Sequence, residues 1–297
     1  SVRPESASSR CSALLNLAPK GSAGVTSWRV ASTATLSRRA ASRPCINFGG
    51  IARTRLLGLL GAALILSCSA CAVPDRGVLD EAVAAAANGG LLREDITLGR
   101  FQIASWHRGL PGARHITVYL EGDGHAWISR RRLSDDPTPR DPLALRLATK
   151  DPGSAVLYLA RPCQFGGGPA APSCDARYWS SHRYAPEVLA AFVAALDWAA
   201  LQAGPKVKVR FGLVGYSGGG ALAALLAQQR DDIAWLLTIA ANLDVHAWTS
   251  HHRLSRLSGS LDPVVHAQGL RGLPQQHLIG DRDELVPALT RARFLAA

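Results

Sequence analysis

A glycine-rich turn in the second half of the chain joins an apolar β-type run to an Ala- and Leu-rich segment. The run covers residues 207–214, the helical segment covers residues 218–229, and Ser217 lies between them in the pattern Gly-Tyr-Ser-Gly-Gly. A serine on such a sharp strand-to-helix turn needs very small neighbours, because a larger side chain collides with the adjacent strand or helix. The pattern therefore predicts a nucleophile elbow with Ser217 as the catalytic nucleophile. The elbow glycines are Gly215, Gly218 and Gly219.

Two other interpretations of this turn carry less weight. An ordinary glycine-rich connection between a strand and a helix would have a similar composition. A phosphate-binding loop requires a lysine and a different glycine spacing, and neither is present in residues 215–220. We therefore set the phosphate-binding interpretation aside.

From about residue 95, short β-type runs alternate with longer Ala- and Leu-rich segments. This alternation predicts βαβ units and a mostly parallel sheet. The expected strands are residues 101–107, at the edge of the sheet, and residues 115–120, 155–160, 207–214, 233–240 and 276–279. The expected helices are residues 142–150, 186–201, 218–229 and one that begins at residue 287, whereas residues 242–270 are expected to form a cap or loop over the site.

Acyl transfer needs two N–H donors at the point where negative charge develops on oxygen. One comes from the residue after the nucleophile and the other from the loop after an earlier strand. Gly218 supplies the first donor. Asp123 is expected to supply the second, because Gly122-Asp123-Gly124 directly follows the strand expected at residues 115–120. A plain turn would suit the same Gly-Asp-Gly sequence.

The acid of a catalytic triad is expected after a strand that follows the nucleophile. Asp283 fits this place, Asp281 suits a turn, and Asp244, after the preceding strand, is the reserve candidate. The base should be a histidine beyond the acid, but the last histidine, His277, precedes Asp283. We therefore expect that a C-terminal truncation has removed the base. His125, His246, His251, His252 and His266 are expected to be loop or surface residues, and a place lining the pocket is an alternative for His125, next to the oxyanion turn.

The formal charge of +11 is unevenly distributed along the chain. The first 71 residues hold nine Lys or Arg and one acid, a net +8, and residues 72–297 hold the other 24 Lys or Arg and 21 acids, a net +3. A nearly balanced domain lacks the basic footprint of a polyanion-binding protein. Nucleic acid is therefore not an expected partner.

The N-terminal residues have the composition of an extension and a targeting segment. Residues 1–50 are rich in Ser, Ala and Arg and contain no Met, which favours a disordered or mis-started extension over a transit peptide. Residues 51–71 combine a basic flank, an apolar run and small residues, which is typical of a signal peptide for export. Cys71 and Cys68 are candidate lipidation sites, so a lipid anchor in a membrane of the cell envelope is a further expectation.

Cys163 and Cys174 flank a Gly- and Pro-rich loop. In an exported protein such a pair is expected to form a disulfide, whereas in a reducing cytosol it would remain as two thiols. A single pair without clustered partners falls short of the four ligands of a structural zinc site. No metal and no cofactor are therefore expected.

The chain resembles the α/β-hydrolase superfamily over residues 95–297, with residues 72–94 as a linker and entry helix. The stretches LEGDGHAW, SDDPTPRDP, YLARPCQ, GYSGGGALAALLA and AANLDVHAW also resemble a bacterial group of uncharacterised, lipoprotein-like α/β hydrolases. The resemblance implies a mostly parallel central sheet with helices on both faces, here without its last strand and helix. It further implies Ser217 as the nucleophile and a location in the periplasm or on an envelope membrane, but no particular substrate.

These observations lead us to expect an exported serine hydrolase that acts on a small-molecule ester, or on a thioester or amide. A non-catalytic envelope protein that keeps the hydrolase scaffold for binding is an alternative, because a fold does not dictate a function. An acyltransferase with the same triad is another.

Overall fold

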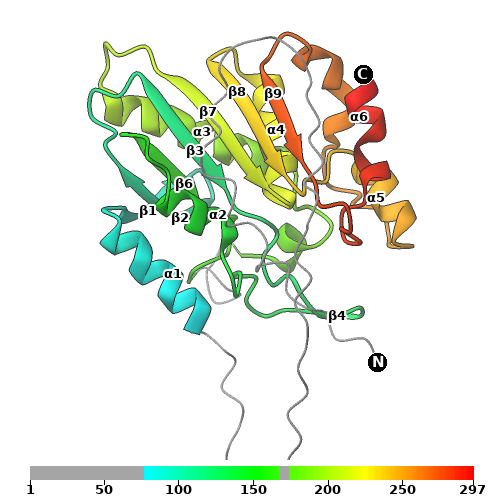
Figure 1. Ribbon diagram of the computed structural model, residues 1–297. Coiled ribbons are helices and arrows are strands. Elements are labelled where there is room, and N and C mark those ends of the chain that lie inside the picture. The colour runs from blue at the N-terminus through cyan, green and yellow to red at the C-terminus, as the bar shows by residue number, and fades with distance from the viewer. Residues whose placement is uncertain (1–76, 167–173) are drawn as a thin grey trace, which may run out of the picture. The chain divides into compact units, whose positions relative to one another are not determined.

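The computed structural model describes residues 77–166 and 174–297 (Figure 1). The extension expected at residues 1–50 and the signal peptide expected at residues 51–71, with Cys68 and Cys71, lie outside the described residues. The expected linker and entry helix contains helix α1 (Gly77–Asn88) and the start of strand β1 (Leu92–Leu98). The domain boundary expected at residue 95 therefore falls inside a strand.

A seven-stranded sheet forms the centre of the described domain (Figure 1). After β1 its strands are β2 (Phe101–Arg108), β3 (His115–Leu120), β6 (Val156–Leu159), β7 (Arg210–Tyr216), β8 (Ile233–Ile239) and β9 (Gln275–Leu278). In space the order is β1-β2-β6-β3-β7-β8-β9. The pairs from β6 to β9 are parallel, whereas the β1–β2 and β2–β6 pairs are antiparallel. The predicted mostly parallel sheet is confirmed.

The prediction that residues 101–107 form an edge strand is wrong. These residues belong to β2, which lies second in the sheet because β1 pairs with it from end to end. β1 has the sequence LREDITL and buries only Ile96 and Leu98. Three consecutive charged residues in this strand conceal the alternation by which a half-buried strand is recognised.

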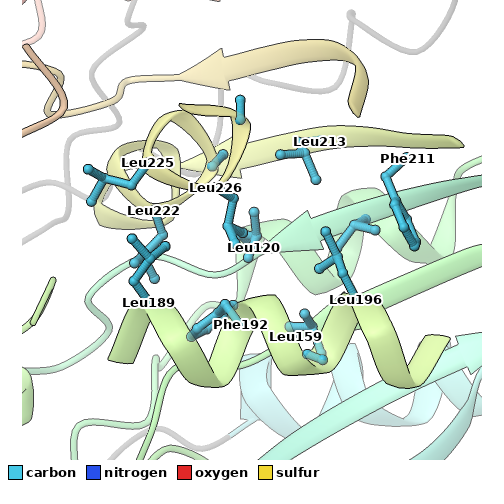
Figure 2. Close-up of a cluster of buried hydrophobic side chains, with 14 of the residues drawn as sticks. Leu120, Leu159, Leu189, Phe192, Leu196, Phe211, Leu213, Leu222, Leu225 and Leu226 are labelled. Carbon is cyan, nitrogen blue, oxygen red and sulfur yellow. The ribbon is translucent and has the colours of Figure 1, made fainter. Parts of the chain in front are cut away.

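Helices cover both faces of the sheet. On one face, α1 and α2 (Leu143–Thr149) pack in a cluster with Trp106 and Tyr158. On the other face lie α3 (Pro186–Ala203) and α4 (Gly218–Gln229). Leucine and phenylalanine side chains of these two helices meet those of β3, β6 and β7 and form the larger core (Figure 2).

Helix α3 illustrates how the apolar spacing fixes this packing. It begins with Pro186, whose fixed φ suits the first helical turn, and it ends before Gly204. The helix is long and apolar enough to span a membrane. Its buried side chains, however, include Val188, Phe192 and Leu196, which recur at helical spacing and pack into the core. Its composition is therefore accounted for by a place in the domain core.

Short elements complete the described domain. A two-stranded hairpin is formed by β4 (Trp127–Ser129) and β5 (Arg132–Leu133). The segment expected as a cap or loop, residues 242–270, contains α5 (Val245–His251) and the 3₁₀ segment η3 (Pro263–Leu270). The other short helices are η2 (Ala176–Trp179), η4 (Ala288–Arg291) and α6 (Ala292–Ala296).

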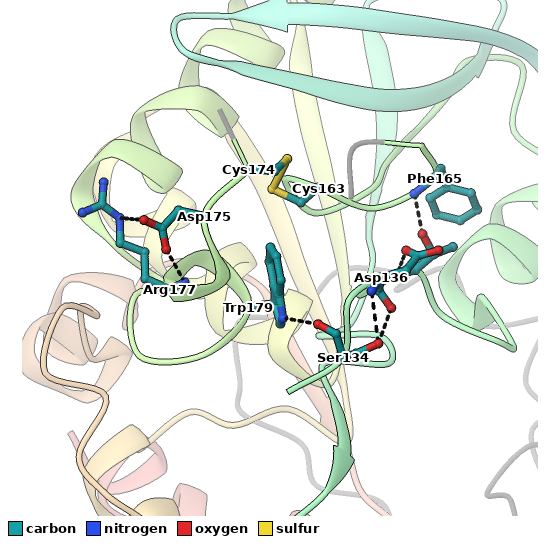
Figure 3. Close-up of a disulfide and its surroundings, with 9 residues drawn as sticks. Ser134, Asp136, Cys163, Phe165, Cys174, Asp175, Arg177 and Trp179 are labelled. Atoms are coloured by element: carbon teal, nitrogen blue, oxygen red, sulfur yellow. Dashed lines mark hydrogen bonds and ion pairs between the residues drawn. A yellow bond between two sulfur atoms is a disulfide. The ribbon is translucent and has the colours of Figure 1, made fainter. Parts of the chain in front are cut away.

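Cys163 and Cys174 form a disulfide, as the sequence predicts, with their Cα atoms 5.5 Å apart (Figure 3). Cys163 is buried in a small apolar cluster with Ala126 and Trp179. The indole Nε1 of Trp179 donates a hydrogen bond of 3.1 Å to the carbonyl oxygen of Ser134. The disulfide thus lies beside the base of the β4–β5 hairpin.

Candidate active site

Ser217 occupies the turn between β7 and α4 with φ 50° and ψ −120°. A positive φ is sterically costly for a residue with a Cβ, and such a conformation persists only where the surrounding structure enforces it. Here the Ser217 N–H donates a hydrogen bond of 2.8 Å to the carbonyl oxygen of Ile239 at the end of β8. The serine is half-buried. This is the strained strand-to-helix turn that a nucleophile elbow requires.

The glycines of the elbow are dictated by close packing. A Cβ on Gly215 would lie 2.5 Å from the carbonyl oxygen of Gly219. A Cβ on Gly219 would lie 2.5 Å from the carbonyl oxygen of Glu121, in the segment that follows β3. Both distances are far inside van der Waals contact. The expected need for very small residues around Ser217 therefore has a direct steric cause.

The loop after β3 lies against the elbow. A Cβ on Gly122 would lie 3.4 Å from the Cβ of Ser217, and a Cβ on Gly218 would lie 2.5 Å from the Asp123 Cγ. The Gly122 N–H already donates to the Glu121 carboxylate at 2.9 Å. The Asp123 N–H has no such acceptor within residues 77–166 and 174–297. The structure thus brings the two expected oxyanion donors, Asp123 and Gly218, to the same turn.

The carboxylate of Asp123 forms ion pairs with two buried arginines. Its Oδ1 accepts from Arg161 Nη1 at 2.9 Å, and its Oδ2 accepts from Arg183 Nη1 at 2.6 Å. Arg161 also donates to the carbonyl oxygen of Arg183, which links the two arginines. Burial opposes ionisation of Asp123, but the two guanidinium groups outweigh it and hold the pKa of this carboxyl below its usual value. The side chain of the expected oxyanion residue is thus fixed as an anion.

Two further contacts fix the backbone of this loop. Gln164 Nε2 donates to the carbonyl oxygen of Gly122 at 3.1 Å, and Gln164 Oε1 accepts from the Arg161 N–H at 3.0 Å. Gly124 has φ +66°, and a Cβ there would meet Pro137 and Gln164. Only glycine fits this position, so the Gly-Asp-Gly sequence has a structural reason at its end as well as at its start.

Glu121 lies fully buried beneath the same loop. Its Oε2 accepts a hydrogen bond of 3.1 Å from the Tyr158 hydroxyl, and its Oε1 binds the Gly122 N–H. Burial raises the pKa of Glu121 to about 7, although these hydrogen bonds and N–H groups of α2 act in the opposite direction. A buried carboxyl group with a raised pKa therefore holds Gly122, the first glycine of the loop after β3.

The aspartates considered as the triad acid differ in their environments. Asp283 lies at the turn after β9, and its Oδ1 accepts from the N–H groups of Leu285 and Val286, each at 2.9 Å. Asp244 is buried, caps α5 through the Ala247 N–H and forms a 3.2 Å ion pair with Arg293. Asp281 is exposed. Because β7, β8 and β9 are parallel, Asp283 lies at the same edge of the sheet as Ser217.

All nine histidines of the chain lie within the described residues. Across these residues, the structure shows no hydrogen bond between a histidine and the Ser217 hydroxyl. His277 is buried and uses both ring nitrogens, Nδ1 with Thr238 at 2.8 Å and Nε2 with Gln275 at 3.1 Å. His125 is half-buried and its Nε2 lies 3.1 Å from Arg140 Nη2. Among the described residues, no histidine is therefore hydrogen-bonded to the candidate nucleophile.

A strained turn from the central parallel strand β7 into helix α4, a loop after β3 that packs on this turn, and helices on both faces of the sheet together identify the fold. The domain has the α/β-hydrolase fold. No protein-family model matches the chain, and no curated protein matches it in sequence.

Solved structures of α/β hydrolases are similar to this chain at low sequence identity. An esterase from Pyrococcus furiosus is 13% identical with a TM-score of 0.48, over 70% of this chain and 78% of the esterase. An acylaminoacyl peptidase from Pyrococcus horikoshii is 12% identical with a TM-score of 0.48, over 69% of this chain and 34% of the peptidase. A protein of unknown function from Agrobacterium tumefaciens, described as a putative α/β hydrolase, is 15% identical with a TM-score of 0.44, over 69% of this chain and 78% of that protein.

Sequence reasoning missed the groups that hold the loop after β3, which contains the candidate oxyanion residue. Arg161 lies two residues after the end of β6 and Glu121 directly follows β3, so both stand where the carboxyl ends of neighbouring parallel strands converge. A place just after a parallel strand is the sequence signal that would have identified Arg161 and Glu121 as candidate site residues. Arg183 carries no comparable signal, because it precedes a helix. Within the described residues, no group of three or more His, Cys, Asp or Glu side chains is arranged to hold a metal ion.

Proposed function

We propose that this protein is a serine hydrolase that cleaves carboxylic esters, and that Ser217 is its nucleophile. The observation that carries the proposal is the strained backbone of Ser217 at the elbow, directly against the loop that contains Asp123. Backbone strain of this kind is concentrated at functional sites. At a nucleophile elbow it exposes the serine hydroxyl at the end of the sheet, where an unstrained turn would not place it. Thioesters and amides are attacked by the same chemistry.

In the proposed reaction, the Ser217 Oγ forms a bond to the carbonyl carbon of the ester, and the carbonyl oxygen becomes an oxyanion. The N–H groups of Asp123 and Gly218 stabilise that charge. Collapse of the tetrahedral intermediate expels the alcohol, which takes a proton, and leaves an acyl group on Ser217. Water then hydrolyses this acyl-enzyme and restores the serine.

A general base is needed to remove the proton from Ser217. In this fold the base follows the acid along the chain, and residues 284–297 contain no histidine. We propose that Asp283 is the acid that orients this base, because its turn follows β9 at the same edge of the sheet as Ser217.

Export to a bacterial cell envelope and lipidation at Cys71 or Cys68 belong to the same proposal. The disulfide between Cys163 and Cys174 supports an oxidising compartment. The signal-like composition of residues 51–71 supports export. Detection of a diacylglyceryl adduct by mass spectrometry of the protein expressed in a bacterial host, and its disappearance in Cys71→Ala or Cys68→Ala, would test the anchor.

The proposed nucleophile is tested with a fluorophosphonate probe in the presence and absence of imidazole, which can act as a soluble base. We expect an adduct on Ser217, located by tandem mass spectrometry, and we expect imidazole to accelerate its formation. Ser217→Ala should give no adduct, whereas Ser250→Ala, which changes an exposed serine on α5, should label as the native chain does.

Failure to label Ser217 with imidazole present, in a chain whose circular dichroism shows an intact fold, would contradict this function. It would favour a non-catalytic binding protein on the same scaffold. An acyltransferase would label in the same way, and the ratio of ester to acid products formed with competing alcohols would distinguish it from a hydrolase.

A further inference from the structure

The hairpin that follows the oxyanion loop has an exposed tip. In this hairpin Trp127 pairs with Leu133 and Ser129 pairs with Arg132, so Arg130 and Arg131 form the turn. All three residues of β4 are exposed. The ribbon has two strands and is separate from the seven-stranded sheet (Figure 1). Within residues 77–166 and 174–297, the side chains of its tip are therefore open to solvent.

Two large apolar side chains are displayed at this tip. Trp127 is 43% exposed and its neighbour Ile128 is 47% exposed. The register shifts between Trp127 and Ser129, so Ile128 is the extra residue of a bulge, and the two adjacent side chains add apolar surface beside the turn. Single exposed apolar residues are ordinary on protein surfaces. Two adjacent large apolar side chains beside an exposed turn are not explained by packing of the domain.

Three consecutive arginines adjoin these apolar residues. Arg130, Arg131 and Arg132 are all exposed, and within the described part of the chain none of them forms an ion pair. The nearest acids along the chain, Asp135 and Asp136, come after β5, at the base of the hairpin. Positive charge is thus concentrated at the tip.

The base of the hairpin is held firmly. Leu133 packs on the cluster of Ala126, Cys163 and Trp179, and the Ser134 N–H donates to the carbonyl oxygen of Ala126 at 3.0 Å. The disulfide and the Trp179 hydrogen bond lie at the same place (Figure 3). A firmly held base with an exposed tip can bind a partner without first becoming ordered.

We propose that this hairpin tip binds the surface of an anionic lipid bilayer, with Trp127 and Ile128 at the boundary of the acyl chains and the three arginines on the phosphates. Tryptophan is suited to the interfacial region, and basic side chains beside it are attracted to anionic headgroups. A narrow turn that exposes two large apolar side chains directly beside three arginines without ion pairs in the described residues fits shallow insertion by the tip, with the charge complementary to anionic headgroups.

A nucleic acid fits the tip less well than a bilayer does. A nucleic acid would contact the arginines and the Trp127 ring, but Ile128 has no aromatic face on which a base could stack.

The hairpin also lies close in sequence to the loop at the candidate active site. Trp127 follows Gly124 by three residues, and the loop that contains Gly124 packs on the elbow. Binding by the tip would therefore hold the candidate active site close to the lipid surface.

The proposal is tested by flotation of the full chain with phosphatidylcholine vesicles and with vesicles that also contain phosphatidylglycerol. We expect binding to the anionic vesicles. Replacement of the three arginines by glutamine should weaken it on the order of 100-fold, because each basic residue near an anionic surface contributes about fivefold. The double change Trp127→Ser and Ile128→Ser should weaken it at least about tenfold.

Matched controls separate the hairpin from general charge and hydrophobicity. Arg256→Gln, Arg271→Gln and Arg282→Gln remove three exposed arginines elsewhere. Leu201→Ser and Val265→Ser remove two apolar side chains that are 68% and 67% exposed. Both control variants should bind as the native chain does. Every variant keeps residues 1–76, so binding by that part is common to all of them.

A second measurement reports on Trp127 itself. Subtracting the tryptophan fluorescence spectrum of Trp127→Phe from that of the native chain isolates the emission of Trp127. On addition of anionic vesicles, this emission should shift to the blue, and lipids with brominated acyl chains should quench it. An unshifted difference spectrum would overturn the proposal. So would equal losses in the control variants, or binding to a single-stranded oligonucleotide without binding to vesicles.

Discussion

The carboxylate of Asp123 lies where a side chain on Gly218 would have to be, so that a Cβ on Gly218 would approach the Asp123 Cγ to 2.5 Å. The residue after the nucleophile and the residue expected to supply the other oxyanion donor are therefore packed directly on each other. Two buried arginines hold Asp123 in this position. The geometry of the candidate oxyanion hole thus depends on a contact that leaves no space for a side chain on residue 218.

Substitution Gly218→Ala should reduce labelling of Ser217 by the fluorophosphonate in imidazole by about 100-fold. The added methyl group displaces Asp123 or the elbow, and loss of one oxyanion donor has an effect of that size in serine hydrolases. The rate of adduct formation, followed by intact mass, measures the effect. Gly272→Ala is the matched control, because a Cβ there meets nothing within 4 Å. Equal labelling of the two variants would show that the contact has no bearing on the reaction.

Substitution Asp123→Asn should lower the free energy of unfolding by about 3 kcal/mol. The change removes the counter-charge of Arg161 and Arg183, and an unpaired charge inside a protein is strongly unfavourable. Urea unfolding followed by circular dichroism measures the loss. Asp95→Asn, which breaks an exposed pair with Arg93, should cost less than about 1 kcal/mol. Losses of similar size in the two variants would contradict the structural role of the arginine pair.

The native chain should lose stability as the pH rises from about 4.5 to 7 because of Glu121, and the substitution Glu121→Gln should abolish this pH-dependent loss. Burial raises the pKa of Glu121 from 4.5 to about 7, so over this range the folded state holds a proton that the unfolded state has released. The stabilisation from this group is complete at low pH and is lost as the pH rises through the pKa of the folded state. The difference between the unfolding free energies of the variant and the native chain should change by at most about 3 kcal/mol across this range. A difference that does not vary with pH would refute this role of the buried carboxyl.

Substitution His277→Asn should have the opposite pH signature. Burial, and then the charge of Arg291, lower the pKa of His277 from 6.5 to about 4. The unfolded state therefore binds the extra proton, and stability that is present above pH 6.5 is lost as the pH falls toward 4. The variant should be less stable than the native chain at neutral pH, yet lose less stability on acidification. Unfolding in urea at several pH values decides whether the acid-dependent loss disappears.

The sequence predicts the strand, the tight turn and the helix around Ser217 because their requirements are local. Ser217 and its glycines combine a strand, a tight turn and a helix within a short segment, and each of these leaves a mark in composition. The strand β1 leaves no such mark, because three consecutive charged residues face solvent near its start and the pairing with β2 alone makes it part of the sheet.

The surroundings of the candidate oxyanion hole required three-dimensional information. Asp123 meets Arg161 and Arg183 across 38 and 60 residues of sequence. No periodicity connects positions so far apart. Glu121 is similar, because a lone glutamate after a strand resembles an ordinary loop residue until Tyr158 and α2 are seen to enclose it.

A crystal structure of the fluorophosphonate adduct tests the central claim most directly. The account predicts phosphorus on the Ser217 Oγ and a phosphoryl oxygen about 2.7–3.1 Å from the backbone nitrogens of both Asp123 and Gly218. Phosphorus on another side chain, or a phosphoryl oxygen that points away from the loop after β3, would contradict it.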